Sequence, residues 1–151
     1  MGISGPAVVA TQGRIYPDTE RVMGWDIGGS GFRIVLSTGV ADVIEQYVGD
    51  DVSDFLSEHD LKTTDIANWV CHPGGPKVLE ALERTLDLHD GQLAVTWRSL
   101  AAIGNLSSSS VLHVLADTMY GEPAAEPEPG TPALMMAMGP GFCAELVLLR
   151  W

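Results

Sequence analysis

Two apolar runs at the end of the chain, residues 133–138 and 143–150, constrain its fold more strongly than any other feature. Only the turn Gly139–Gly141 and one further residue separate them. Two neighbouring strands joined by so short a connection can pair only in the antiparallel direction, because a parallel pair needs a much longer crossover. We therefore expect residues 133–150 to form a hairpin in the core of a β-sheet.

Upstream of this hairpin, segments with the periodicity of a strand alternate with segments that have the periodicity of a helix. Residues 14–31 are polar and Gly-rich. Gly49 could interrupt the first expected helix, residues 41–58. The four prolines of residues 121–132 predict an extended surface loop. Together these patterns indicate an α/β layered domain with a mixed sheet. The expected strands cover residues 7–10, 32–37 and 66–71, and the expected helices cover residues 41–58, 75–88, 96–103 and 107–119.

The composition limits the classes of function. With 151 residues, 46% of them hydrophobic, the chain suits one domain with a substantial core. Eight Lys and Arg against 20 Asp and Glu give a formal charge of −12, which disfavours nucleic acid and anionic membrane surfaces as partners. No apolar run approaches the length of a membrane span, and two cysteines are too few for a disulfide framework, so we expect a cytoplasmic protein.

A histidine stands where a predicted strand meets a predicted helix. Residues 71–76 read Cys-His-Pro-Gly-Gly-Pro, so prolines fix the backbone beyond His72 while two glycines let another group approach closely. A helix that begins just afterwards disfavours the imidazolium, so we expect a neutral ring at pH 7. Such a ring can donate to a developing oxyanion or accept a proton from a thiol. The alternative is that His72 only caps the helix.

An asparagine occupies a second turn, between two predicted helices. Residues 104–108 read Gly-Asn-Leu-Ser-Ser, and asparagine in such a place is commonly a turn residue or a helix cap. The alternative for Asn105 is an amide N–H that points at a thioester oxygen and stabilises an enolate as part of an oxyanion hole.

The order of the three turns resembles the C-terminal half of the type III polyketide synthases, the chalcone- and stilbene-synthase-like branch of the thiolase fold. His-Pro-Gly-Gly-Pro begins at His72, Asn105 follows 33 positions later, and Gly-Pro-Gly at 139–141 precedes the final strand. The resemblance extends from about residue 14 to the end of the chain. Residues 25–31 are similar to bacterial members, several of which make alkylpyrones from long-chain acyl starters.

This resemblance implies a decarboxylative Claisen condensation between an acyl-coenzyme A starter and malonyl-coenzyme A, without a further cofactor or a metal. It places His72 and Asn105 at the family's catalytic His and Asn, which stabilise the thioester oxyanion and the enolate. Met138 stands where the family usually has phenylalanine, and Ala137 replaces a glycine, so the cavity lining is expected to differ. By resemblance the substrate-binding positions are Phe32 at the gate between tunnel and cavity, Ser107 in the cavity wall, and Met138, Gly139, Pro140 and Gly141 in the loop.

The family's nucleophilic cysteine has no expected counterpart in this chain. Cys71 is adjacent to His72, but successive residues of a strand point to opposite faces, so its thiol should face away from the site. Cys143 is expected to pack within its strand. We therefore expect the nucleophile in a cysteine-bearing N-terminal lobe that ends within residues 1–13, followed by the C-terminal domain over residues 14–151. The resemblance further implies a homodimer.

Two alternatives remain open, and a third is set aside. The first is a ketoacyl-carrier-protein synthase that initiates fatty-acid synthesis and also uses Cys, His and Asn. The second is a catalytically inert fragment that kept the fold. In the third, residues 26–31, Asp-Ile-Gly-Gly-Ser-Gly, resemble the phosphate loop of sugar kinases and actin-like ATPases, although the strand before them is weak and no second nucleotide motif follows.

Overall fold

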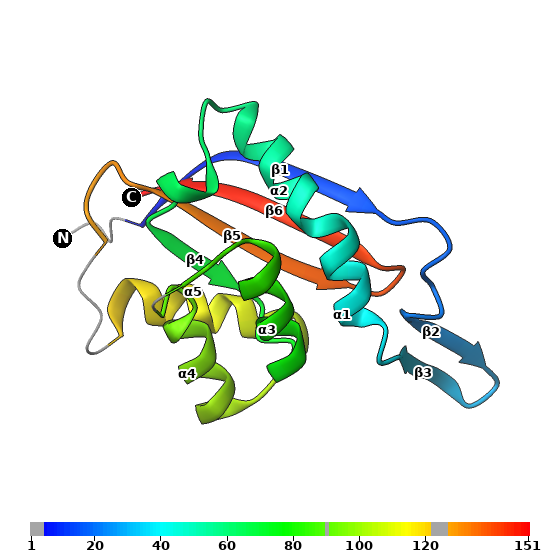
Figure 1. Cartoon of the computed structure of the whole chain (residues 1–151). Coiled ribbons are helices and arrows are strands. Elements are labelled where there is room, and N and C mark those ends of the chain that lie inside the picture. The colour runs from blue at the N-terminus through cyan, green and yellow to red at the C-terminus, as the bar shows by residue number, and fades with distance from the viewer. Residues whose placement is uncertain (1–4, 90, 122–126) are drawn as a thin grey trace.

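A four-stranded mixed sheet forms the centre of the molecule (Figure 1). The computed structural model describes residues 5–89, 91–121 and 127–151. β6 is antiparallel to both of its neighbours, whereas β4 and β5 are parallel, so the predicted mixed sheet and terminal hairpin are confirmed. Across the sheet the order is β1 (Ala7–Ile15), β6 (Cys143–Arg150), β5 (Pro132–Gly139) and β4 (Asn68–Cys71).

Strand β1 is longer than the four residues that the sequence predicts. It pairs with β6 from Ala7 to Ile15, with one register irregularity between Val8 and Ala10. Residues 7–13 therefore share a sheet with the end of the chain, and β1 crosses residue 13 without a break. The division into the end of a preceding lobe and a domain of residues 14–151 stays a prediction.

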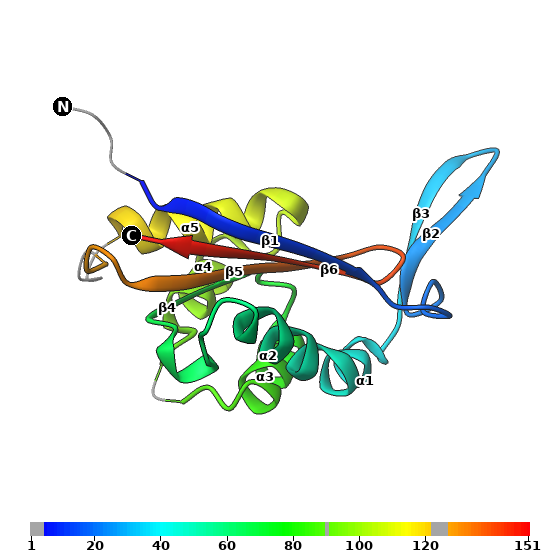
Figure 2. The same ribbon diagram turned by 90° about the horizontal axis from the view of Figure 1, so that it is seen from above.

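One face of the sheet is covered by a continuous helical run and by α3 (Figure 2). The run consists of α1 (Val40–Val43), the π-helical turn η1 (Ile44–Val48) and α2 (Gly49–Ser57), and α3 spans Pro76–Thr85. The helix is not interrupted at Gly49, which corrects that expectation. A Cβ on Gly49 would lie 3.0 Å from Thr85 Cγ2, so this glycine lets the end of α3 approach closely.

The other face is covered, over β4 and β5, by α4 (Ala94–Ile103) and α5 (Ser110–Tyr120). Two short 3-10 helices complete the chain order: η2 (Thr63–Asp65) precedes β4, and η3 (Ser107–Ser109) precedes α5. Val70 of β4 packs with Val111 and Val114 of α5 in a small second core. Leu134 and Met136 face the larger core on the α1–α3 side. Because both faces are covered here, these strands are almost uniformly apolar rather than alternating.

A second, two-stranded sheet projects from the body as the hairpin β2 (Met23–Gly28) and β3 (Gly31–Leu36) (Figures 1 and 2). β3 was predicted, whereas β2 falls in the stretch expected only to be polar and Gly-rich. Trp25 pairs with Ile34 and Ile27 with Phe32, so one face of the hairpin is apolar, and all four side chains are exposed.

Candidate functional site

His72 follows directly on β4, at the edge of the sheet where the parallel strands β4 and β5 reach their carboxyl ends. Its backbone N–H donates to the Met136 carbonyl on β5 at 2.9 Å, and its own carbonyl accepts from the Gly74 N–H at 2.9 Å. Helix α3 begins at Pro76, after Gly75 with a φ of 150°. The predicted junction of strand, Gly-rich turn and helix is therefore confirmed, with a half-buried imidazole in it.

Burial lowers the pKa of His72 below its ordinary value of 6.5, because the charged imidazolium loses contact with water. The ring is therefore neutral at pH 7, as expected, although desolvation rather than the helix terminus is the cause. A neutral ring keeps one N–H for donation and one free nitrogen for accepting a proton.

Titration of His72 gives a direct check. Between its lowered folded pKa and 6.5 the unfolded chain binds more protons than the folded one, so His72 lowers the free energy of unfolding as the pH falls below 6.5. We expect the His72 ring signals in NMR spectra to titrate with a midpoint below 6.5, the ordinary value of a histidine pKa. A midpoint at or above 6.5 would contradict the lowered pKa of His72.

Asn105 joins the two predicted turns. Its side-chain Nδ2 donates to the Gly74 carbonyl at 3.2 Å, across 31 residues of sequence. Its Oδ1 accepts from the Ser107 N–H at 2.8 Å, which supports Ser107 at a φ of 61°. The Oδ1 atom of Asn105 therefore has the turn-forming role that the sequence suggests. Its amide nitrogen carries two hydrogens, of which one bonds to Gly74 and the other can be donated to another acceptor. The side chain is exposed, so an incoming group can reach it.

The loop Gly139–Gly141 lies at the same edge of the sheet, at the end of β5. Gly139 is three residues beyond Met136, the residue that accepts the His72 N–H. Met138 is half-buried beside the larger core, and Pro140 is exposed. Gly141 has a φ of 96°, a backbone conformation that favours glycine.

Phe32 lies apart from His72 and Asn105 in the structure of this chain. It stands on β3 with 72% of its surface exposed, and its ring meets Trp25 edge-on at a centroid distance of 6.2 Å. Figure 2 shows the hairpin projecting from the body of the molecule, away from α3, α4 and α5. The assignment of Phe32 to a cavity gate therefore stays a prediction that needs a further surface opposite the hairpin.

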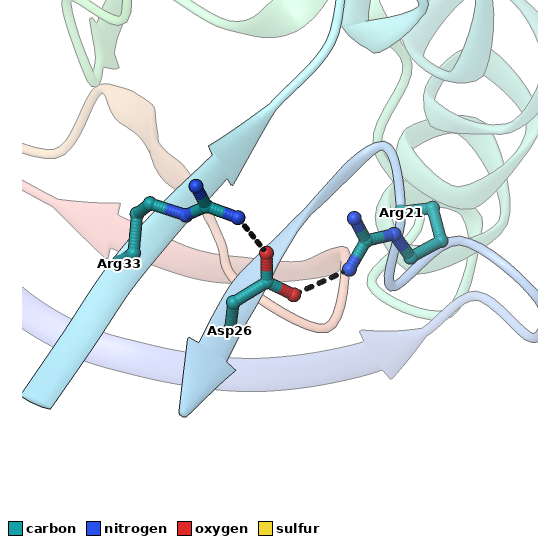
Figure 3. A network of polar contacts seen from close by, with 3 residues as sticks. All are labelled: Arg21, Asp26 and Arg33. Atoms are coloured by element: carbon teal, nitrogen blue, oxygen red, sulfur yellow. Dashed lines mark hydrogen bonds and ion pairs between the residues drawn. The ribbon is translucent and has the colours of Figure 1, made fainter. Parts of the chain in front are cut away.

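The polar face of the hairpin carries an exposed ion-pair network (Figure 3). Asp26 accepts from Arg33 at 2.9 Å and from Arg21 at 2.5 Å, and these bonds hold the pKa of its carboxyl group below the ordinary value. A shallow pocket of about 260 Å³ lies beside Asp26 and Arg33. Residues 28–31 form the turn of the hairpin between β2 and β3.

The two cysteines differ in their surroundings. Cys71 is fully buried in the larger core with Trp69, whereas Val70 faces the second core, so the strand alternates as expected and the Cys71 thiol points away from α5. Burial raises the pKa of Cys71 to about 12. Cys143 is half-buried, with its Sγ 3.9 Å from the Pro140 carbonyl.

Alkylation of the native protein with iodoacetamide at pH 8 is therefore expected to modify Cys143 well before Cys71, because Cys71 lacks both thiolate character and access. Peptide mass spectrometry of the two cysteine-containing peptides measures the ratio, and denaturation should make both react. Rapid labelling of Cys71 in the native protein would contradict the buried position of its thiol.

Sequence reasoning missed one set of buried contacts, those of Tyr16, Thr19 and Asp51. Tyr16 and Asp51 are 35 residues apart, and no motif links them. Over the described residues, no cluster of three or more His, Cys, Asp or Glu side chains is arranged to hold a metal ion. The described helices also include none that is long and apolar enough to span a bilayer.

Comparison with known proteins adds to this geometry. The family described as "Chalcone and stilbene synthases, C-terminal domain" matches residues 7–151. A 1,3,6,8-tetrahydroxynaphthalene synthase of Streptomyces peucetius subsp. caesius is 54% identical over 150 residues, which cover 99% of this chain and 39% of that protein. An alpha-pyrone synthesis polyketide synthase-like protein of Mycobacterium tuberculosis is 30% identical over 135 residues, with coverages of 89% and 34%.

Solved structures show the same relationship. The 1,3,6,8-tetrahydroxynaphthalene synthase of Streptomyces coelicolor A3(2), described as a bacterial type III polyketide synthase, superposes with a TM-score of 0.89 at 26% identity. The alignment covers 100% of this chain and 42% of that one. PKS-I from the brown alga Ectocarpus siliculosus gives a TM-score of 0.84 at 26% identity, with coverages of 96% and 39%. The chain thus spans about two fifths of the length of these relatives.

Proposed function

This chain belongs to the chalcone and stilbene synthases, as a C-terminal domain of that family, and from this premise we propose that it supplies His72 and Asn105 to a type III polyketide synthase. In this reaction an acyl-coenzyme A starter is condensed with malonyl-coenzyme A. The single observation that best supports the proposal is the 3.2 Å bond from Asn105 Nδ2 to the Gly74 carbonyl, because it holds the Asn turn against the His turn.

The chemistry follows from what the two side chains can donate. When the malonyl thioester loses carbon dioxide, the electrons of the broken C–C bond form an enolate whose charge lies on the thioester oxygen. The neutral His72 and the free N–H of Asn105 stabilise this oxygen by hydrogen bonds. The enolate carbon then attacks the acyl thioester on the enzyme, a new C–C bond forms, and the cysteine thiolate leaves. No cofactor beyond the coenzyme A thioesters is needed for these steps.

The nucleophilic cysteine is proposed to lie in a separate N-terminal lobe, since Cys71 is buried with a raised pKa and relatives extend well beyond this chain. The exposed apolar face of the hairpin supports such a lobe, because a two-stranded hairpin with one uncovered apolar face is marginal on its own. We further propose a homodimer in the cytoplasm, where the free thiols of both cysteines persist. The exposed apolar side chains include Trp25, Ile27, Phe32, Ile34 and Leu36.

The class of product has two candidates. Residues 25–31 favour an alkylpyrone, as the sequence resemblance suggests. The 54% identity to a protein named for tetrahydroxynaphthalene, against 30% to one named for alpha-pyrone synthesis, favours a polyhydroxylated aromatic product instead. The second candidate rests on the greater similarity, and we adopt it.

Mass spectrometry tests the proposal. The protein that carries this chain together with its N-terminal lobe is incubated with malonyl-coenzyme A, either alone or with a long-chain acyl-coenzyme A. We expect a polyhydroxylated aromatic product, and an acyl adduct on a cysteine outside residues 1–151. Alkylpyrones as the main product would favour the first candidate. An adduct on Cys71 or Cys143 would overturn the assignment of the nucleophile.

A further inference from the structure

The segment between β1 and β2 is bonded to the loop Gly139–Gly141. The Tyr16 N–H donates to the Phe142 carbonyl at 3.0 Å, and the Gly141 N–H donates to the Met23 carbonyl at 2.8 Å. The β5–β6 loop accordingly lies beside the base of the β2–β3 hairpin in both views (Figures 1 and 2). Residues 16–23 thus connect the β2–β3 hairpin with the β5–β6 loop, which lies more than 100 residues later in the sequence.

Thr19 makes the side-chain part of this connection. It is only 6% exposed, and its Oγ1 lies 2.7 Å from the Tyr16 carbonyl and 3.3 Å from the Gly141 carbonyl. Its single hydroxyl hydrogen can be shared between the two acceptors. Because the site is buried, water does not replace this hydroxyl easily, and its loss would leave a carbonyl without part of its hydrogen bonding.

Tyr16 anchors the segment to the helices. Its ring stacks on Tyr47 at a centroid distance of 4.8 Å and packs against Phe142 at 5.8 Å. Its hydroxyl donates to Asp51 of α2, which also pairs with Arg14 at 3.5 Å. Tyr47 belongs to the π-helical turn η1, a kind of turn that is rare and that often occurs near functional sites.

The protonation state of Tyr16 suits this role. Burial first, and then the hydrogen bond to Asp51, raise the pKa of Tyr16 well above its ordinary value. The phenol therefore keeps its hydrogen and remains a donor over the whole range in which proteins are active. Asp51, held by both Arg14 and Tyr16, is a fixed acceptor on a long helical run.

We propose that Tyr16 and Thr19 are positioning residues that hold the Gly139–Gly141 loop against the base of the β2–β3 hairpin. The inference rests on the proposed function and on the predicted positions of this loop and of Phe32 at the border of the acyl cavity. Their separation then sets the space for the growing chain. Tyr16 and Thr19 consequently determine the distribution of product lengths without touching the substrate.

The test compares Thr19→Val, which keeps the shape and loses the hydroxyl, with Thr19→Ser, which keeps the hydroxyl. Thr118→Val is the matched control, since its buried hydroxyl bonds to the Val114 carbonyl within α5. Tyr16→Phe, which keeps both ring contacts, is a second variant should Thr19→Val fail to fold. Each is made in the protein with its N-terminal lobe.

Two readouts are measured. The first is the ratio of products of different chain length, which does not depend on how much enzyme is folded. The second is amide hydrogen exchange of the peptide that contains Gly141 and Phe142. In Thr19→Val and Tyr16→Phe we expect exchange to rise roughly threefold to tenfold, the range that corresponds to one lost hydrogen bond, together with a severalfold change in the product ratio. Thr19→Ser and Thr118→Val should match the wild type.

Unchanged exchange in both Thr19→Val and Tyr16→Phe would overturn the positioning role. Faster exchange with an unchanged product ratio would overturn the link to the cavity. An equal shift in Thr19→Ser would assign the effect to the methyl group and so overturn the role of the hydroxyl. A wild-type protein without turnover would overturn the proposed function and the cavity role together, while the exchange data would still decide whether the loop is held.

Discussion

Replacement of His72 by glutamine is expected to lower the turnover of the complete synthase by at least about 100-fold, the usual cost of one oxyanion-hole donor. Glutamine has a similar length, but its flexible amide does not hold an N–H at the place of the imidazole N–H, and it cannot accept and return a proton near neutral pH. The backbone bonds of His72, to Met136 and from Gly74, do not involve the side chain, so the turn should survive the change. The fold is therefore expected to remain.

Steady-state assay of malonyl-coenzyme A consumption measures this effect, and its decarboxylation in the absence of a starter isolates the enolate-forming step. Both rates should fall if His72 stabilises the enolate. His113→Gln is the matched control, because His113 is exposed on α5 and lies outside the proposed site. A His72→Gln enzyme that retains turnover within about threefold of the wild type would leave only the helix-capping interpretation of His72.

The pH profile of the wild type should reflect the same ring. Because burial lowers the pKa of His72 below 6.5, its neutral form persists as the pH falls toward and below that value. Turnover is thus expected to decline only at a pH below 6.5, when the ring becomes charged and can no longer accept a proton from the thiol, and the decline should be absent from the residual activity of His72→Gln. A loss of activity that begins well above pH 7 would indicate a different titrating group.

The parts of the fold that the sequence predicted are those determined by local pattern. The terminal hairpin followed from two apolar runs and a turn with Gly141, and the helices followed from apolar spacing. β2 was missed because it belongs to a sheet of two strands and its Trp25 and Ile27 are exposed, so no burial pattern marks it. The continuity of the helix through Gly49 was also missed, because it depends on the close approach of Thr85 from another helix.

In the candidate site, too, local motifs could be predicted from the sequence and contacts between distant segments could not. The motifs located His72 and Asn105, since each lies in a turn whose glycines and prolines are visible in the sequence. Their connection through the Gly74 carbonyl depends on how α4 and α5 pack on β4, which no local pattern specifies. The contacts of Tyr16 with Asp51 and of Thr19 with Gly141 join distant segments without any motif, so only the tertiary structure reveals them.

Replacement of Asn105 by aspartate separates the two roles of this side chain. Aspartate keeps an oxygen in place of Oδ1, so it can still accept from the Ser107 N–H, now 2.8 Å from Oδ1. It loses the Nδ2 hydrogens that donate to the Gly74 carbonyl and, as proposed, to the thioester oxygen. A carboxylate would also repel the enolate. We expect decarboxylation and turnover to fall by about 100-fold to 1000-fold.

Gln92→Glu is the matched control for this change. Gln92 Oε1 accepts from the His89 N–H at 2.9 Å in an exposed turn, so the substitution makes the same exchange of amide for carboxylate and likewise keeps an acceptor. It should leave turnover within about twofold of the wild type. Asn105→Ala, which removes the turn-supporting oxygen as well, should also lose turnover, and it should be less stable than Asn105→Asp in urea denaturation because the Ser107 N–H loses its acceptor. If Asn105→Asp retains near wild-type turnover while Asn105→Ala does not, Asn105 serves only to shape the turn, and the oxyanion must depend on His72 and on donors from the N-terminal lobe.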